Sequence, residues 1–387
     1  MDFTIDRADM LAAIDKCALA TEAKHATEAF RLMLVDATRQ KTNKAKETAR
    51  FAAVGETCTV DTVVHADIKE KGDFVVMPGH LRSIVASMPP GRVRFSLGKD
   101  DKITVKSLTS SRKATFKRHT HELRTVEDPG KGASWSEVDA RELSRALGIV
   151  KTSTVWVGRD EPSVSLLIPT ERGLDVFGCN SYTVALVETS IRMSGDNVQV
   201  PAAMGAALSL MLDVDDKVSV FSDGLRTYFQ NCDTLVSALL ADERSPKRYK
   251  FQGEMLTRVL DTVHGLDPEM VVGPSLKTTH ITQGLKSVQG IAGFASGTES
   301  GDYGYKVHVV FGKDTVIVEL GLADADARDE FDVITSASEL EFWLGHRVFE
   351  QMLAMLSSTE EVQAVRTINM LLLRSQGIVC GILEQSK

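Results

Sequence analysis

Hydrophobic and polar positions follow the same succession of patterns in three stretches of the chain. In the first stretch, Pro78 follows a run of β-forming residues, and apolar residues recur at helical spacing over Leu81–Met88. Apolar and polar residues then alternate over Val93–Leu97 and again from Ile103, which predicts a β-hairpin with one face in solvent. The stretches that share this succession of strand, short helix and antiparallel strands are Phe74–Arg118, Val198–Leu240 and Phe342–Leu383.

A second pattern, an amphipathic helix after a short strand, occurs near the start of each third of the chain. These helices are predicted over Asp6–Leu19, Asp139–Val150 and Gly253–His264, with Asp6 and Asp139 as N-caps. Threefold repetition in 387 residues predicts three domains of about 130 residues, near the commonest domain size. The predicted fold class is α+β, with two helices against antiparallel sheets in each domain. The predicted domains are residues 1–127, 133–249 and 250–387.

The segments between these elements give less regular patterns. We expect a strand over Thr154–Val157, which is rich in β-forming residues, and an acidic turn over Asp324–Asp332. Turn-forming residues make His119–Ser136 the first linker, and Ala241–Lys250, basic after Glu243, the second.

Composition narrows the class of protein. The formal net charge of −8 argues against a surface that is basic throughout, although it allows a basic region. The five cysteines are scattered and form no CxxC pair, which indicates buried reduced thiols. The first residues carry no signal-peptide pattern and no apolar run is long enough to span a membrane, so we expect a cytoplasmic protein without a membrane partner.

Candidate catalytic chemistry is sparse. His119, His121 and Glu122 have the residue types of a metal site, but a linker position without a distant fourth ligand favours solvated side chains. No nucleophile, base and orienting acid can be named together, so we expect a protein that is not an enzyme and that needs no cofactor or metal. A cytosolic enzyme with an unrecognised site is one alternative. A ligand or metal bound at His119 and His121 would favour it.

Three sequence segments and the second linker follow one another in an order that identifies a family resemblance. MDFTIDRADMLAAIDKCALAT opens the chain, and FVVMPGHLRSIVASMPPGRVRF and NVQVPAAMGAALSLML contain the second helices of the first two predicted domains. The second linker contains Asp242, Arg244, Pro246 and Tyr249. In this order and spacing the whole chain resembles the bacterial DNA polymerase III beta subunit, the sliding clamp. Members of that family begin M-x-F, end a strand in proline before the helix of each early domain, and carry D-G-R-F-P-D-Y in the second linker.

The resemblance implies a head-to-tail homodimer that forms a ring of six domains, with helices lining a central hole and sheets outside. Double-stranded DNA would pass through the hole without sequence reading, and the clamp loader, the DNA polymerase and other clamp-motif proteins would be partners. Edge strands of the first and third domains would close the ring, and Ser110–Arg118 is the candidate in the first. The alternative within this fold is a binding module for replication proteins that does not encircle DNA.

Helices that line such a hole need Lys and Arg side chains that face phosphates. Met204–Met211, on the second helix of the second domain, contributes no charge. The candidate DNA-binding residues are Lys24, Arg82, Arg141, Arg145, Lys151, Arg244, Arg258 and Arg347.

The resemblance also implies a pocket, between the second and third domains, for the short linear motif of partner proteins. The family's T-D-G-H-R-L wall corresponds to Gly178–Thr183, where the His-Arg pair is absent, and its C-terminal V-V-M-P-M-R-L wall corresponds to Ile378–Glu384. An apolar groove of different shape is therefore expected. The candidate pocket residues are Gly178, Asn180, Ser181, Tyr182, Thr183, Pro246, Val379, Ile382 and Leu383.

Overall fold

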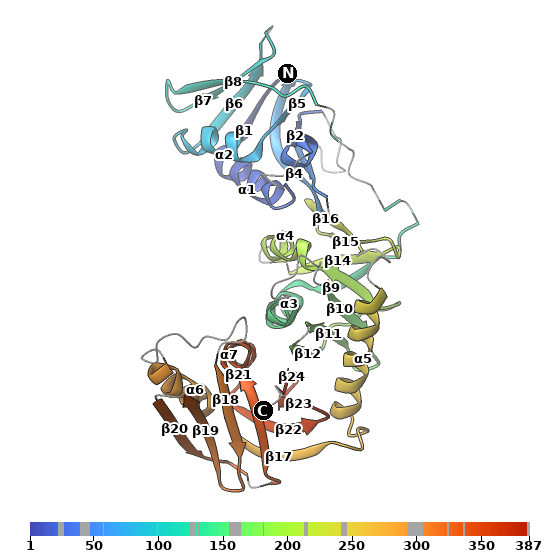
Figure 1. The fold of residues 1–387 in the computed structure, drawn as a ribbon. Helices are drawn as coiled ribbons and strands as arrows, with labels where there is room; N and C mark the ends of the chain where they lie inside the picture. Colours follow the sequence, from blue (N-terminus) through green and yellow to red (C-terminus); the bar gives the residue numbers. More distant parts are fainter. Residues whose placement is uncertain are drawn as a thin grey trace. The chain divides into compact units, whose positions relative to one another are not determined.

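The computed structural model in Figure 1 divides into two compact units. Unit 1 comprises Met1–Ser144 and Ala203–Leu240, and unit 2 comprises Arg145–Ala202 and Ala241–Lys387. The structure describes the chain apart from residues 22–26, 39–46, 57, 99, 122, 124–128, 131, 155–163, 181, 213–215, 241–245, 293–304, 323–324, 336 and 385–387.

One succession of elements occurs three times along the chain: a strand, a helix, four strands, a helix and three strands. The first occurrence also contains a short 3-10 helix, η1. Its elements are β1 (Asp2–Asp6), α1 (Arg7–Ala18), η1 (Glu28–Arg31), β2 (Met33–Asp36), β3 (Thr48–Val54), β4 (Cys58–Glu70), β5 (Asp73–Val76), α2 (Pro78–Ala86), β6 (Arg92–Leu97), β7 (Lys102–Ser107) and β8 (Lys113–Lys117).

The second and third occurrences are separated by a longer helix, α5 (Pro246–Val263). The second consists of β9 (Ser136–Asp139), α3 (Ala140–Thr154), β10 (Val164–Pro169), β11 (Leu174–Cys179), β12 (Thr183–Thr189), β13 (Val198–Pro201), α4 (Ala202–Leu212), β14 (Lys217–Ser222), β15 (Arg226–Gln230) and β16 (Thr234–Leu239). The third consists of β17 (Val271–Lys277), α6 (Thr278–Ala292), β18 (Lys306–Phe311), β19 (Thr315–Leu322), β20 (Ala325–Asp332), β21 (Leu340–Gly345), α7 (His346–Met355), β22 (Glu361–Thr367), β23 (Met370–Ser375) and β24 (Ile378–Leu383).

Local sequence explains where the early helices begin. The Asp6 carboxylate accepts a hydrogen bond from the backbone N–H of Ala8 at 2.8 Å, and Asp139 accepts one from Glu142 at 2.8 Å. Both aspartates therefore cap α1 and α3 as predicted. Pro78 occupies the first turn of α2, where its missing N–H costs nothing. The second helix and the hairpin of all three predicted stretches are confirmed.

Unit 1 is built on one large antiparallel sheet. Its strands follow the order β8-β7-β6-β1-β4-β16-β15-β14-β9, and β3, β2 and β5 branch from β4. The 13-residue strand β4 makes this possible, because its first half pairs with β16 and its second half with β1. Below α1 and α2, the rings of Phe3 and Phe95 stack at 5.0 Å between centroids, and Phe74 stacks on Phe95.

Unit 2 contains two antiparallel sheets. The first runs β13-β10-β11-β12-β24-β23-β22-β17, so that β12 of the second repeat pairs with β24 of the third. The second runs β20-β19-β18-β21, with α6 packed on β19 and β20 (Figure 1). The unpaired sides of β8 in unit 1 and β20 in unit 2 are sheet edges in the described chain.

Several expectations were wrong. The segment predicted as the helix Gly253–His264 is helical and lies in α5, but it is not the repeated helix. The helix that follows the first strand of the third repeat is α6. Asp324–Asp332 is not a turn, because residues from Ala325 onward form β20, whose inward side chains Ala327 and Phe331 alternate with charged residues. The acidic character of this segment hid that alternation.

Three smaller expectations also need correction. Thr154 ends α3 rather than beginning a strand, and residues 155–157 lie outside the described residues. Pro246–Lys250, predicted as part of an irregular linker, is helical and belongs to α5. Four of the five cysteines are buried, but Cys232 is exposed.

Candidate nucleic-acid interface and partner groove

The predicted cation on α2 is already paired. Arg82 donates through Nε to Oδ1 of Asp15 on the neighbouring helix α1 at 2.6 Å, and both side chains are about half exposed. The two cations of α1 also make hydrogen bonds: Lys16 donates to Thr234 Oγ1 at 3.0 Å, and Arg7 donates to the backbone carbonyl of Val85 at 3.1 Å. Of these three cations, Arg82 is the one whose charge is balanced by a carboxylate.

α3 carries three of the predicted cations. Arg141 forms an exposed ion pair with Asp216 at 3.0 Å. Arg145 and Lys151 are exposed, and within the described part of the chain neither side chain has a hydrogen-bond or ion-pair partner. They are the uncompensated cations among the predicted residues of this helix.

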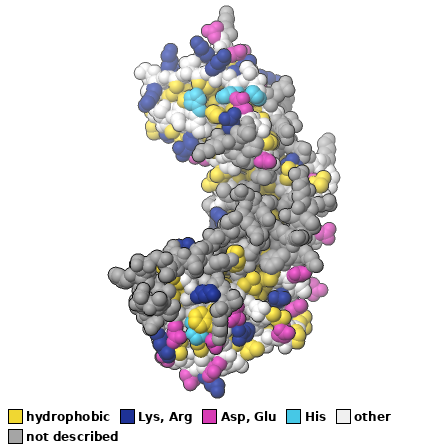
Figure 2. All heavy atoms as spheres, in the orientation of Figure 1, with side chains coloured by type: hydrophobic (Ala, Val, Ile, Leu, Met, Phe, Trp, Pro, Cys, Tyr) yellow, Lys and Arg dark blue, Asp and Glu magenta, His cyan; other side chains and the backbone are white. Residues whose placement is uncertain are grey.

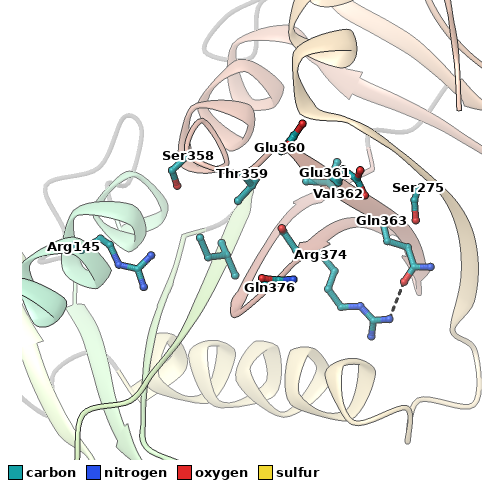
Figure 3. Close-up of a pocket in the computed structure, with 12 residues that line it drawn as sticks. Arg145, Ser275, Ser358, Thr359, Glu360, Glu361, Val362, Gln363, Arg374 and Gln376 are labelled. Atoms are coloured by element: carbon teal, nitrogen blue, oxygen red, sulfur yellow. Dashed lines mark hydrogen bonds between the residues drawn. The ribbon is translucent and has the colours of Figure 1, made fainter. Parts of the chain in front are cut away.

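Arg145 lines a hollow of about 520 Å³ in unit 2, shown in Figure 3. Arg374, which donates to Gln363 Oε1 at 2.7 Å, lies across the same hollow. Glu360 and Glu361 are also on its wall. Because cations and carboxylates share this lining, the hollow has no concentrated charge of either sign.

Arg258 is not where the repeat predicts it. It lies on α5, whereas α6 is the helix that occupies the repeated position. The pKa of the nearby Asp267 carboxyl is lowered mainly by a hydrogen bond from Thr367, and the positive charge of Arg258 contributes further. Arg258 therefore lies near the turn that follows α5.

The sequence prediction missed the cation of α6, which is the exposed Lys286. Ile281, Leu285 and Val288 are buried at helical spacing on the opposite side of this helix, and that spacing could have revealed it. On the last helix, α7, Arg347 is exposed as predicted. Lys24 and Arg244 lie outside the described residues.

The two predicted walls of the partner pocket lie side by side in unit 2. Thr183 on β12 is directly opposite Ile382 on β24, and the backbone N–H of Leu383 donates to the carbonyl of Tyr182 at 2.9 Å. Strand pairing thus joins segments that are about 200 residues apart in sequence.

Asn180 has a structural contact that the sequence did not suggest. Its Oδ1 accepts hydrogen bonds from the backbone N–H groups of Tyr182 and Thr183, both at 2.8 Å, and the residue is only 2% exposed. Asn180 therefore holds the turn before β12. Ser181 lies outside the described residues.

The predicted pocket residues are distributed over both faces of the sheet. Gly178 faces α3, where an added Cβ would lie 3.0 Å from the Val150 carbonyl oxygen, so it does not line a groove on the other face. Val379 and Leu383 belong to the apolar cluster on the α5 face. Ile382 lies between them in the strand and points to the opposite face.

The chain itself covers this apolar surface. Met255 and Val259 of α5 are buried against Phe177, Val184 and Val379, in a cluster to which β11, β12, β23 and β24 contribute. Pro246, predicted to be part of the pocket, begins α5. α5 therefore occupies much of the surface on which a groove was expected.

One titratable group on this sheet is perturbed. Asp175 on β11 is partly buried and directly opposite Glu188 on β12. Burial, followed by the negative charge of Glu188, raises the pKa of Asp175 to about 6. The carboxyl group therefore destabilises the folded unit when it is ionised.

The two histidines of the first linker both contact the carboxylate of Glu28. His119 Nδ1 lies 3.2 Å from Glu28 Oε1, and His121 Nε2 lies 3.6 Å from Glu28 Oε2. Glu122 lies outside the described residues. Among the residues that the structure describes, no group of three or more His, Cys, Asp or Glu side chains could hold a metal ion, and no helix is long and apolar enough to cross a membrane.

Solved structures resemble the full length of the chain. The DNA polymerase sliding clamp of Bacillus subtilis matches 100% of this chain and 99% of its own with a TM-score of 0.80 and 13% identity. The DNA polymerase III beta subunit of Thermotoga maritima matches with a TM-score of 0.79 and 16% identity, over 100% of this chain and 99% of its own. The beta subunit from the DNA polymerase of Streptococcus pyogenes matches all of both chains at 0.79 and 12%.

The chain has the bacterial sliding-clamp fold. No protein-family model and no curated protein sequence matches it. Sequence identities of 12–16% show how far the side chains diverge from those of the solved clamps while the backbone architecture is kept. The fold resemblance predicted from the sequence is confirmed.

Proposed function

We propose that the chain is a DNA polymerase sliding clamp, a processivity factor without catalytic residues of its own. Two copies close head to tail into a ring, and double-stranded DNA passes through it without sequence reading. The observation that carries this proposal is the agreement in fold over all of this chain and 99–100% of the solved clamps. In this proposal each of the three repeats is one clamp domain, and the third domain begins at β17 rather than inside α5.

Charge on two edge strands supports ring closure. β8 is the edge of the unit 1 sheet and exposes Lys113 and Lys117. β20 is an edge in unit 2 and exposes Glu330 and Asp332, together with Arg328, which pairs with Glu330 at 3.4 Å. Pairing of β8 of one copy with β20 of the next would satisfy both open strands and bring opposite charges together, and two such seams close the ring.

The DNA-facing residues in this proposal are cations on the repeated helices. They contact phosphates as point charges, which suits sliding because no base is read. Arg258 is left out because it lies on α5. The proposed set is Arg82, Arg141, Arg145, Lys151, Lys286 and Arg347.

The proposed partners are a clamp loader, a DNA polymerase and other clamp-motif proteins, which meet the sheet face around Val379 and Leu383. Because α5 covers that face, an incoming apolar motif competes with Met255 and Val259. We therefore expect a standard clamp-motif peptide to bind more weakly than micromolar. Ordinary micromolar binding would contradict an altered groove.

A second candidate is a clamp-fold binding module that does not encircle DNA. The pairing of Arg82 with Asp15 and of Arg141 with Asp216 favours it, because paired cations attract phosphates weakly. Sedimentation over a wide concentration range and at two salt concentrations separates the two. A species of twice the chain mass supports the ring, and a monomer throughout supports the module.

A further inference from the structure

Four lysines form a compact group on strands β7 and β8 of unit 1. In the register of the two strands, each β7 lysine lies directly opposite a β8 lysine. Between the two pairs, the hydroxyl oxygens of Thr104 and Thr115 lie 3.4 Å apart, so this set of side chains points to one face of the sheet. These four residues, here called the lysine quartet, are Lys102, Lys106, Lys113 and Lys117.

The quartet lies on the face of the sheet that is turned away from the helices. Ile103, Val105 and Phe116 alternate with it and are buried. Phe116 packs on His80 of α2, which puts α2 on the buried side. In Figure 2, Lys and Arg side chains gather over the upper part of unit 1, around the strands that Figure 1 labels β7 and β8.

The charges of the quartet are uncompensated, unlike those of the neighbouring arginines. Arg94, opposite Lys106, pairs with Asp2, and Arg92 pairs with Asp67 at 2.5 Å. The four lysines are exposed, and their ammonium groups have no hydrogen-bond or ion-pair partner in the part of the chain that the structure describes. Like charges directly opposite one another destabilise a strand pair, so folding alone does not account for the arrangement.

The spacing of the quartet suits a polyanion. The two lysine pairs are four residues apart along the strands, which corresponds to about 13 Å, and the strands are about 5 Å apart. About 13 Å of duplex axis carries roughly eight phosphate charges. Lysine ammonium groups are compact point charges that contact phosphates without a fixed planar geometry.

We propose that the lysine quartet binds the phosphodiester backbone of nucleic acid, single-stranded or double-stranded, on the face of unit 1 opposite to α1 and α2. This contact is separate from DNA inside a ring. All four lysines are exposed in the single chain, whereas in a closed ring Lys113 and Lys117 also border the proposed seam. It gives the protein a second, sequence-independent site for nucleic acid.

The test compares the double variant Lys102→Glu/Lys106→Glu with the wild type. Both positions are on β7, one strand inside the sheet edge, so the edge itself is unchanged. Each new glutamate faces a β8 lysine and adds a favourable cross-strand pair, so the variant should fold at least as stably as the wild type. Lys69→Glu/Lys313→Glu is the matched control, because it changes the net charge equally at exposed positions outside the quartet.

Fluorescence anisotropy with a labelled 20-nucleotide single strand, and with its duplex, gives affinity as a function of salt. If all four lysines contact phosphates, the logarithmic salt slope of the wild type is about −2.8 for the single strand or −3.6 for the duplex. The double variant should bind at least about tenfold more weakly at low salt, with about half that slope, and the control should match the wild type. The probe bound more tightly identifies the natural form.

Equal affinity and slope for the double variant and the control would overturn the proposal. So would binding of polyglutamate, lost in the double variant, without binding of either oligonucleotide, because that result assigns the quartet to an acidic protein segment. Retention on circular DNA is measured in parallel with the wild type, because the new glutamates face Lys113 and Lys117 of the proposed seam. Failure of the quartet and failure of the ring are thereby distinguishable.

Discussion

The guanidinium Nε of Arg82 on α2 lies 2.6 Å from the carboxylate Oδ1 of Asp15 on α1. Both groups are exposed at the surface of the helix pair that the clamp proposal turns toward DNA. A phosphate and Asp15 therefore compete for the same guanidinium. Under the clamp proposal, this pair would weaken phosphate binding at this surface.

Removing the competing carboxylate should strengthen DNA binding. We expect Asp15→Asn to raise duplex affinity several-fold at low salt and to steepen the salt slope by up to about 0.9, the value for one added phosphate contact. Anisotropy titrations over a range of salt concentrations measure both quantities. Asp9→Asn removes the same charge from α1 away from Arg82, and an equal gain in that control would show a general charge effect instead.

Stability should fall as the pH rises through the titration of Asp175. Its folded-state pKa of about 6 is above the ordinary value of 3.8, so the folded chain binds this proton more tightly than the unfolded chain. The contribution is fully present below about pH 4 and is lost as the pH passes 6. Relative to the wild type, the free energy of unfolding of Asp175→Asn should therefore be about 1 kcal/mol higher at pH 7.5 than at pH 4, after allowance for solvent screening.

Urea unfolding at the two pH values measures that difference. Glu188→Gln is the companion variant, because it removes the opposing charge and should lower the pKa of Asp175 without removing its carboxyl. An Asp175→Asn effect that is the same at both pH values would contradict the assignment.

Gly381 should not accept a side chain. An added Cβ would lie 2.5 Å from the Leu372 side chain and 2.7 Å from that of Val184, inside the cluster under α5. Gly381→Ala is expected to destabilise unit 2 by about 1–3 kcal/mol through overpacking. Gly148 in α3 has no atom within 4 Å of its added Cβ, so Gly148→Ala should instead stabilise the helix by about 0.5–1 kcal/mol. Urea unfolding that ranks the two variants alike would argue against this packing.

The proposed ring seam predicts a charge swap. Lys117→Glu places a carboxylate on β8 against the acidic β20 of the next copy, and should weaken the dimer about five- to tenfold. Adding Glu330→Lys in the same chain should restore much of the loss. Sedimentation measures the dissociation constants, and Lys313→Glu, in the turn between β18 and β19, is the control. Loss without restoration would mean that β8 and β20 do not meet.

Local patterns predicted much of the fold. Helical spacing around Leu81 and strand alternation from Val93 mark α2 and β6 because each element there has one buried and one exposed face. β20 was missed because its charged residues outnumber its inward residues, so the acidic composition of the segment hid the two-residue period of a strand. α6 was missed because α5, also amphipathic, precedes it and was taken for the repeated helix.

The site was less predictable, because ion pairing and the packing of a helix over a sheet depend on tertiary structure. Nothing local to Arg82 indicates that Asp15, from another helix, lies within hydrogen-bonding distance. The pocket walls were aligned correctly as neighbours, since Thr183 faces Ile382, but the sequence could not show that α5 packs over Val379. The lysine quartet likewise depends on strand register, which sets Lys106 opposite Lys113.

The central claim is that two copies form a ring around duplex DNA. In the direct measurement, the protein is incubated with a singly nicked circular plasmid at a concentration where subunits exchange. Bound and free protein are then separated by gel filtration in high salt. A closed ring stays on the circle and is lost when a restriction enzyme linearises the plasmid. Equal retention on circular and linear DNA, or none on either, would contradict encirclement.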